Sequence, residues 1–342
     1  MSQLLVVQGI PKLIANLAMI GTPLQWLVVV LSVVSAVVAI VPQLKALRRR
    51  VLGTMLALLL VGEGILVWFH YRLYQMTPVL DPNTSRVTGH MAISMWVEGE
   101  RLYVWALMVA ILGMLMRKER ERLLPGVLLS VAGIATLGVS TGQPFTHPLP
   151  DFLSQYSSYV QAMQMGGMAA DGAWQGMEAS RQFFYGSWFM WVHPPLLYFS
   201  YGAFTVSFVA TVQMIIYRHS RFETVAYGWA RMGYLPLTAG MLLGFPWAIE
   251  AWQGESWWWS GFVNMSIMMW LLYTAYLHAR LYLRRRHMWR AVAVLGLVSF
   301  GVLVLTYVAS YVVPGAHSYA AWAPDIHALA RAVTAICRGE AA

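Results

Sequence analysis

Two histidines of this sequence stand where an imidazole could hold a metal ion at the end of an apolar helix. His193 begins an apolar run that continues to Tyr217, and two prolines follow it directly. His317 lies just after another apolar run, in the segment Pro314-Gly-Ala-His-Ser-Tyr. Imidazole nitrogens are common ligands for iron. The pair therefore indicates a site at which two rings could clamp one iron-bearing group.

A tryptophan-rich segment between the two histidines could supply flat apolar faces. It contains Trp252, Trp257, Trp258 and Trp259. Indole rings can stack on a porphyrin, and nitrogen ligands suit its iron. Tryptophans are also common at membrane interfaces for structural reasons alone. Because three features converge, we predict a heme site formed by His193, His317 and these four tryptophans.

The residues around the histidines indicate how each would be held. Pro194 and Pro195 fit the first turn of a helix, where backbone N–H groups have no intrahelical partner, so they would fix His193 at a helix start. His278 falls in a later apolar run, close to Arg280. An ionisable group inside a membrane often marks a pathway or a cofactor, although an interfacial histidine beside an arginine fits equally well. If His278 binds heme, this is a second heme on the opposite side.

The composition places these residues in a membrane protein. Hydrophobic residues make up 59% of the chain and charged residues only 11%, far outside the range of soluble proteins. The single cysteine, Cys337, excludes an internal disulfide or a CxxC motif. The net charge of +9 does not indicate a nucleic-acid site, because the basic residues cluster just beyond apolar runs.

The apolar runs predict an all-α integral membrane protein, a bundle of about eight transmembrane helices in one domain covering residues 1–342. The predicted spans are 24–44, 52–71, 91–116, 123–140, 190–217, 226–248, 261–282 and 291–313. Arginine-rich connections follow the first, third, fifth and seventh spans. The positive-inside rule makes these connections cytoplasmic and places both termini on the periplasmic side, together with a long outer loop over 141–189.

The motifs occur in an order that resembles a known family. The order is His193-Pro-Pro-Leu-Leu-Tyr, the tryptophan-rich loop, Tyr-Leu-His278-Ala-Arg, and Gly-Ala-His317-Ser-Tyr. Upstream lie a tryptophan-flanked segment, Trp96–Trp105, and a Pro-Phe loop, Thr141–Phe145. This series resembles the heme-handling proteins of cytochrome c maturation, the CcmF, CcmC and CcsA group, over most of residues 60–320.

The resemblance implies a function for each motif. In that family two outer histidines are axial ligands of heme held against the tryptophan-rich loop, and an inner histidine binds a b-type heme. Carried over, His193 and His317 take the outer roles and His278 the inner one. The implied function is heme delivery to apocytochrome c in the bacterial inner membrane, within a heme lyase system. No residue of this chain is assigned a catalytic role.

The sequence departs from the family pattern at three points. Trp257-Trp258-Trp259 continues into Ser260 without the family's acidic residues, and Arg101 replaces a small polar residue. The second half of a full CcmF, which would provide the partner of the inner histidine, is not in this sequence. A partner subunit of the maturation machinery is expected to supply that ligand.

These departures support an alternative function. The chain could be a repurposed family member, a heme-binding or anchoring membrane subunit of a respiratory electron-transfer complex. A transporter ranks lowest, because broken helices and internal repeats are not apparent. Glu63, in Gly62-Glu63-Gly64, is the only charge that we expect to be truly buried in a span, and a helix-packing or partner role explains it as well as transport does. Expected partners are maturation or respiratory-complex subunits, apocytochrome c and membrane lipid, but not nucleic acid.

Overall fold

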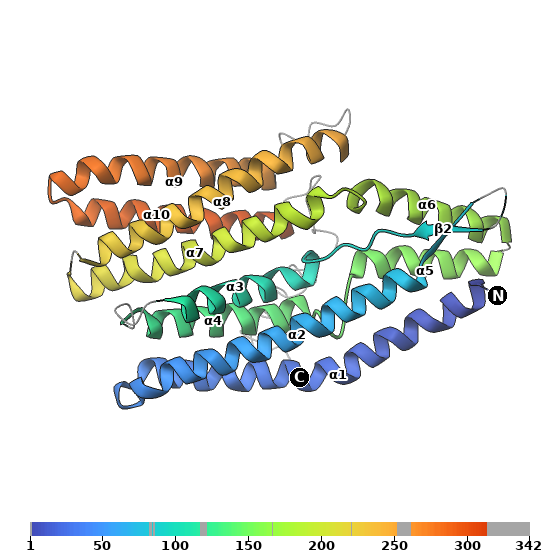
Figure 1. Cartoon of the computed structure of the whole chain (residues 1–342), viewed down its shortest axis with the longest axis horizontal. Helices are drawn as coiled ribbons and strands as arrows, with labels where there is room; N and C mark the ends of the chain where they lie inside the picture. Colours follow the sequence, from blue (N-terminus) through green and yellow to red (C-terminus); the bar gives the residue numbers. More distant parts are fainter. Residues whose placement is uncertain are drawn as a thin grey trace, which may run out of the picture.

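The computed structural model describes residues 2–81, 84, 86–116, 122–165, 167–219, 221–251 and 261–312. These residues are almost entirely helical, with one small two-stranded sheet (Figure 1). The all-α membrane architecture predicted from the apolar runs is confirmed.

The first half of the chain forms one group of helices. It contains α1 (Ser2–Ile40), η1 (Pro42–Leu47), α2 (Arg48–Met76), α3 (Arg101–Leu115) and α4 (Leu124–Leu137). Helix α1 packs against α2 and α4, and α3 packs against α2 and α4. Most of the side chains of α3 are buried, because this helix also contacts the second half of the chain. Helix α3 therefore forms the centre of the bundle.

The second half forms the other group. It contains α7 (Phe189–Tyr217), α8 (Arg221–Ala251), α9 (Gly261–Arg285) and α10 (Trp289–Val312). Helix α7 packs along α8, α9 packs along α10, and α10 also contacts α7. Contacts of α3 and α4 with α7 join the two halves, which lie side by side in Figure 1.

The predicted loop 141–189 contains two helices. They are α5 (Pro150–Met165) and α6 (Gly167–Tyr185), which follow a π turn at Gly138–Gly142. Phe152, Tyr156 and Tyr159 recur on one face of α5, and all three are buried. The Tyr159 ring lies 4.9 Å from the Trp174 ring of α6. This aromatic face explains why the segment folds into a helical hairpin rather than a loop.

Six of the described helical segments are long and apolar enough to cross a membrane. They are Gly9–Ile40, Pro42–Met76, Leu124–Gly142, Phe189–Tyr217, Arg221–Ile249 and Trp289–Tyr311. Helix α3 is apolar but shorter, with 15 residues, and α9 carries more charge. With α3 and α9 included, the helices correspond one by one to the eight predicted spans.

The third predicted span begins later than expected. Residues 91–116 were predicted as one helix, but α3 starts at Arg101 and follows the short 3-10 turn η2 (Glu98–Glu100). Trp96 adopts a positive φ of 60°, and its backbone N–H donates to Glu100 Oε2 at 2.9 Å. A Cβ on Gly99 would approach within 2.1 Å of the Gly142 carbonyl oxygen. The hydrogen bond to the Glu100 side chain and the close approach of Gly99 to Gly142 therefore stand in place of an α-helix in this segment.

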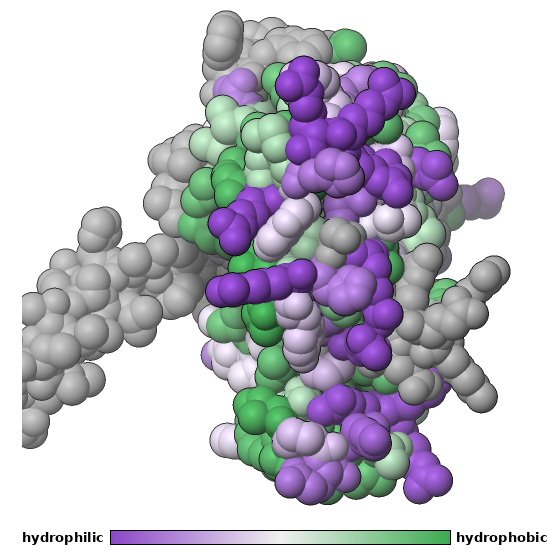
Figure 2. Space-filling model, turned by 90° about the vertical axis from the view of Figure 1, so that its left-hand side faces the viewer, coloured by the Kyte–Doolittle hydropathy of each residue, from purple (hydrophilic) through white to green (hydrophobic). Residues whose placement is uncertain are grey.

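The two ends of the bundle differ in charge. The turns after α1, α7 and α9 all lie at the left-hand end of Figure 1, here called the arginine end, and Figure 2 shows hydrophilic side chains over much of it. The other end, here called the sheet end, holds α5, α6 and the antiparallel strands β1 (Pro78–Leu80) and β2 (Val87–His90). The start of α1 also lies at the sheet end.

With 39 residues, α1 is about 58 Å long and exceeds the roughly 30 Å apolar core of a bilayer.

Candidate functional site

His193 lies in the second turn of α7, toward the sheet end, and its ring is held in a fixed orientation. Its Nδ1 lies 2.6 Å from the Gly240 carbonyl oxygen of α8, so Nδ1 carries the hydrogen and donates it. The Trp247 ring lies 6.5 Å away at an interplanar angle of 30°. Among the described residues, no group bonds Nε2 of His193. A metal-binding histidine typically donates its other ring N–H to a carbonyl in this way.

A glycine of α8 makes room for this ring. A Cβ added to Gly244 would lie 2.7 Å from Cε1 and 3.0 Å from Nδ1 of His193. Gly240, Gly244 and Trp247 recur at helical spacing, so one face of α8 presents a carbonyl, a gap and an indole to the imidazole. This face determines the position of His193.

Two cavities meet at His193. The first, about 530 Å³ including space open to the surroundings, lies between α7, α8 and α9. Its apolar lining includes Leu237, Met241, Phe245 and Met269. The second, about 620 Å³ on the same measure, extends toward α3. The two cavities share His193 and Trp247 in their linings.

The second cavity adds aromatic and charged groups. Its lining includes Trp96, Met190, Tyr198 and Arg101. The Tyr198 hydroxyl donates to the Trp96 carbonyl at 2.6 Å, and Arg101 donates to Ser310 Oγ at 2.8 Å. Arg101 is only 7% exposed. The wall thus combines a buried positive charge with aromatic surface.

These residues fit a planar, apolar group that carries a metal and an acidic substituent, as heme does. The imidazole offers Nε2 in a fixed tautomer, the aromatic and aliphatic side chains match a flat apolar body, and Arg101 would stabilise an acidic group. The geometry supports binding of such a group, and no other described histidine lines either cavity.

His278 lies at a different level of the bundle. It is on α9, exposed, and its Nδ1 lies 2.8 Å from the Thr274 carbonyl oxygen. Met269, which lines the His193 cavity, precedes it by nine residues, about 13 Å along a helix. His193 and His278 therefore lie at different levels of the bundle, and the assignment of a second heme to His278 stays a prediction.

The remaining predicted site residues lie outside the part of the chain that the structure describes. They are His317, Trp252, Trp257, Trp258 and Trp259. Their approach to His193 stays a prediction. Trp247 and Trp96, which sequence reasoning did not assign to the site, are the tryptophans that line the cavities among the described residues.

A buried polar cluster lies behind Trp96. The indole Nε1 donates to Glu63 Oε1 at 2.8 Å, and the backbone N–H of the same residue donates to Glu100. His70 Nε2 lies 3.2 Å from Glu100 Oε1, and His70 Nδ1 lies 2.7 Å from the Leu66 carbonyl. Glu63 and His70 of α2 thus help to position a cavity-lining residue. Their place in α2 gave no indication of this role.

The protonation of this cluster follows from its burial. Glu100, just before α3, is 4% exposed, and burial raises its pKa to about 8 despite the Trp96 N–H that lowers it. The carboxyl is therefore protonated at neutral pH. It can donate to Nε2 of a His70 ring whose hydrogen is on Nδ1, facing Leu66. Two neutral partners explain how the pair is tolerated in an apolar interior.

A comparison with protein families identifies the chain. The sequence model described as "Cytochrome C assembly protein" matches residues 96–317. The chain belongs to this family. The match begins at the cavity-lining Trp96 and ends at the predicted ligand His317, so all predicted site residues lie inside it. Together with the apolar helices, membership establishes a multi-pass membrane protein of the cytochrome c assembly family.

Curated relatives carry names from the same process. The cytochrome c-type biogenesis protein NrfE of Haemophilus influenzae is 34% identical over 134 residues, 37% of this chain and 21% of the relative. CcmF of the same organism is 27% identical over 222 residues, 64% and 30% of the two chains. CcsA of Thermosynechococcus vestitus is 35% identical over 122 residues, 34% and 37%. Each match thus covers less than two fifths of the length of the relative.

Proposed function

We propose that this chain holds heme beside His193, at the periplasmic face of the bacterial inner membrane, for delivery to apocytochrome c. The observation that carries the proposal is the hydrogen bond from His193 Nδ1 to the Gly240 carbonyl, which leaves Nε2 as the ligand nitrogen next to two apolar cavities. Family membership and the relatives' names support the biological context.

Each group at the site has a defined task in this proposal. His193 ligates from one side and its fixed ring orients the bound group, while Trp247 covers the ring and excludes water. Arg101 stabilises an acidic substituent in the second cavity. His317 would be the second ligand to the iron, and Trp252, Trp257, Trp258 and Trp259 would supply the stacking surface.

Heme, when bound, would supply the iron that the imidazoles hold and the vinyl groups to which cysteine thiols add. Those thiols must come from an apocytochrome, because the only cysteine of this chain is Cys337. The role of this chain in the proposal is to bind the heme, to orient it and to shield it from water. Partner subunits and the apocytochrome complete the reaction, and His278 provides an inner site for a second, b-type heme.

Purification of the full chain, with heme measured by absorbance and by heme staining, tests the proposal. His193→Ala is expected to remove most of the bound heme. His219→Ala is the matched control, because His219 is exposed at the arginine end of the bundle and should leave heme content unchanged. Equal heme content in wild type and His193→Ala would contradict the proposal.

One observation favours a second function, a heme-binding or anchoring subunit of a respiratory complex. Trp259 is followed by Ser260, without the acidic residue of the family pattern. A deletion strain separates the two functions. Loss of c-type cytochromes supports heme delivery, whereas normal c-type cytochromes with loss of one respiratory activity supports the second function.

A further inference from the structure

The arginine end contains a basic cavity, far from His193, that the proposed function does not use. The α7–α8 turn, the α9–α10 turn and the helix ends beside them surround it. Its volume is about 1,130 Å³, including space open to the surroundings. The lining residues are Arg218, Arg221, Glu223, Thr224, Arg284, His287, Trp289 and Val292.

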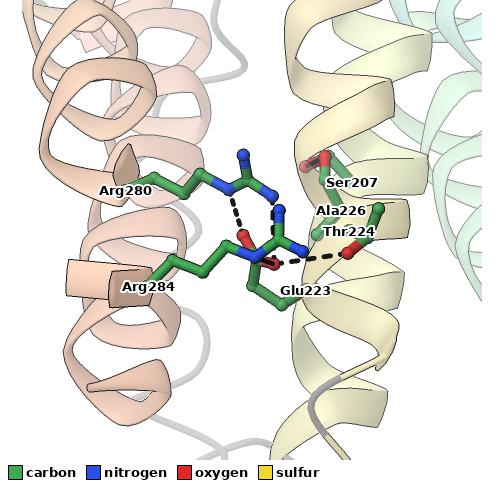
Figure 3. A network of polar contacts seen from close by, with 6 residues as sticks. All are labelled: Ser207, Glu223, Thr224, Ala226, Arg280 and Arg284. Carbon is green, nitrogen blue, oxygen red and sulfur yellow. Dashed lines mark hydrogen bonds and ion pairs between the residues drawn. The ribbon is translucent and has the colours of Figure 1, made fainter. Parts of the chain in front are cut away.

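The net charge of this cavity is positive because Glu223, the acidic residue of its lining, is neutralised by Arg280, which does not line the cavity. Glu223 is buried, and both of its carboxylate oxygens accept hydrogen bonds from the buried Arg280. Figure 3 shows Arg280 and Arg284 of α9 both extending toward Glu223 of α8. Arg280 also lies 3.9 Å from the centroid of the Tyr227 ring. Because Arg280 already neutralises Glu223, the charges of Arg218, Arg221 and Arg284 give the cavity a net positive charge, although Arg284 Nε also lies 3.9 Å from Glu223 Oε2.

The cavity lies at the level where three membrane spans end. Arg221 starts one span, Trp289 starts another, and Tyr217 ends a third. Aromatic side chains at this level are typical of the membrane–water interface. Trp289 and Val292 give the cavity an apolar wall, and the neighbouring Ile216 is 66% exposed. A ligand with a charged head and an apolar body matches both surfaces.

We propose that this cavity binds the phosphate headgroup of an anionic phospholipid. Arginine forks match phosphate oxygens in charge and geometry, and the His287 ring can donate a further hydrogen bond. Basic pockets between membrane helices are suited to such headgroups. The lipid would bridge the α7–α8 turn and the α9–α10 turn, and so hold the second half of the bundle together at this end.

The turn after α9 provides a matched pair of variants. Arg221→Gln/Arg284→Gln removes two charges from the cavity, and Arg285→Gln/Arg286→Gln removes two charges from the same end without touching the cavity lining. All four side chains are exposed, so both variants are expected to fold.

Native mass spectrometry of the purified full chain with added phosphatidylglycerol tests the proposal. Wild type and Arg285→Gln/Arg286→Gln should retain one lipid with similar affinity. Arg221→Gln/Arg284→Gln should bind at least tenfold more weakly, and phosphatidylcholine should not replace phosphatidylglycerol. If both double variants lost lipid affinity equally, the lipid would be attracted to basic residues in general rather than bound in the cavity, and the proposal would be overturned.

A second measurement separates a lipid from a soluble phosphate. Inorganic phosphate is titrated against the lipid-free protein in detergent, and thermal unfolding is recorded. The proposal expects phosphatidylglycerol to raise the unfolding temperature more than phosphate does. An equal shift with phosphate alone would assign the cavity to a soluble ligand and overturn the lipid assignment. His193→Ala should leave the lipid affinity and the shift in unfolding temperature unchanged. A failure of the lipid proposal is therefore independent of the heme proposal.

Discussion

Two contacts with α8 fix the orientation of the His193 imidazole, and each contact can be changed by a separate substitution. The Gly240 carbonyl accepts its hydrogen, and the missing side chain of Gly244 leaves space for its ring. A neutral hydrogen bond of this kind stabilises by about 0.5–1.5 kcal/mol. At a ligand site its larger effect is to fix which nitrogen faces the metal.

Gly244→Ala is expected to lower heme content without unfolding the protein. The new methyl group would lie 2.7 Å from Cε1 of His193, so the ring must turn away from the Gly240 carbonyl. Loss of that bond corresponds to up to about tenfold weaker binding. The heme-to-protein ratio of the purified chain measures the effect.

Gly228→Ala is the control for this change, since it lies on the same helix and an added Cβ meets no atom within 4 Å. Its heme content should equal that of wild type. If both alanine variants keep full heme, the ring of His193 does not determine binding.

The sequence predicted a ligand role for His193, which stays a prediction, but it did not point to most of the residues around that ring. Two prolines after a histidine at the start of an apolar run are a local pattern, and the structure places His193 beside two cavities. Trp247 carried no such signal, because tryptophans near helix ends are common in membrane proteins, and Trp96 stood out only as part of a family motif without an assigned role at the site. Their role depends on contacts of α8 and η2 with α7, which join residues far apart in the chain.

At the scale of the helices, one buried ion pair links α8 to α9. Glu223 and Arg280 are 4% and 5% exposed. Removal of one partner from such a pair leaves an uncompensated charge in an apolar interior and costs about 3–5 kcal/mol. Contacts between α8 and α9 are otherwise sparse compared with those between α7 and α8. This pair is therefore expected to contribute strongly to α8–α9 association at the arginine end.

Glu223→Gln is expected to lower the stability of the lipid-free protein by about 3–5 kcal/mol, because Arg280 stays buried without its carboxylate. Thermal or denaturant unfolding in detergent measures the change. Arg284→Gln is the control, since its side chain is 58% exposed and its Nε lies 3.9 Å from Glu223 Oε2. A surface pair of this kind contributes about 0–1 kcal/mol. Equal destabilisation by both variants would refute the special role of Arg280.

Helix positions followed from hydropathy, whereas several helix ends did not. Eight apolar runs correspond to α1–α4 and α7–α10. The segment at 91–97 is apolar enough to resemble a span, but the Met91 N–H donates to the Thr77 carbonyl and the Trp96 N–H donates to the Glu100 side chain, so these groups make no helical hydrogen bonds. In α5 the aromatic spacing Phe152, Tyr156, Tyr159 was present in the sequence but lay in a segment too polar to predict as a span.

At the scale of the whole molecule, charge is distributed unequally between the two ends. The turns around Arg48, Arg221 and Arg285 share one end, whereas the start of α1, the sheet and the α5–α6 hairpin share the other (Figures 1 and 2). From the positive-inside rule we expect the arginine end to lie in the cytoplasm. The proposed heme site, nearer the sheet end, then faces the periplasm, and the proposed lipid cavity faces the anionic inner leaflet.

Single cysteines introduced at the two ends test this orientation. Met168 of α6 is 92% exposed at the sheet end, and Arg285 is exposed at the other end. In a Cys337→Ser background, Met168→Cys should react with a membrane-impermeant maleimide in intact spheroplasts. Arg285→Cys should react only after the membrane is permeabilised. The opposite pattern would place His193 on the cytoplasmic side, where the thiols of an exported apocytochrome could not reach it, and would contradict heme delivery even if heme is bound.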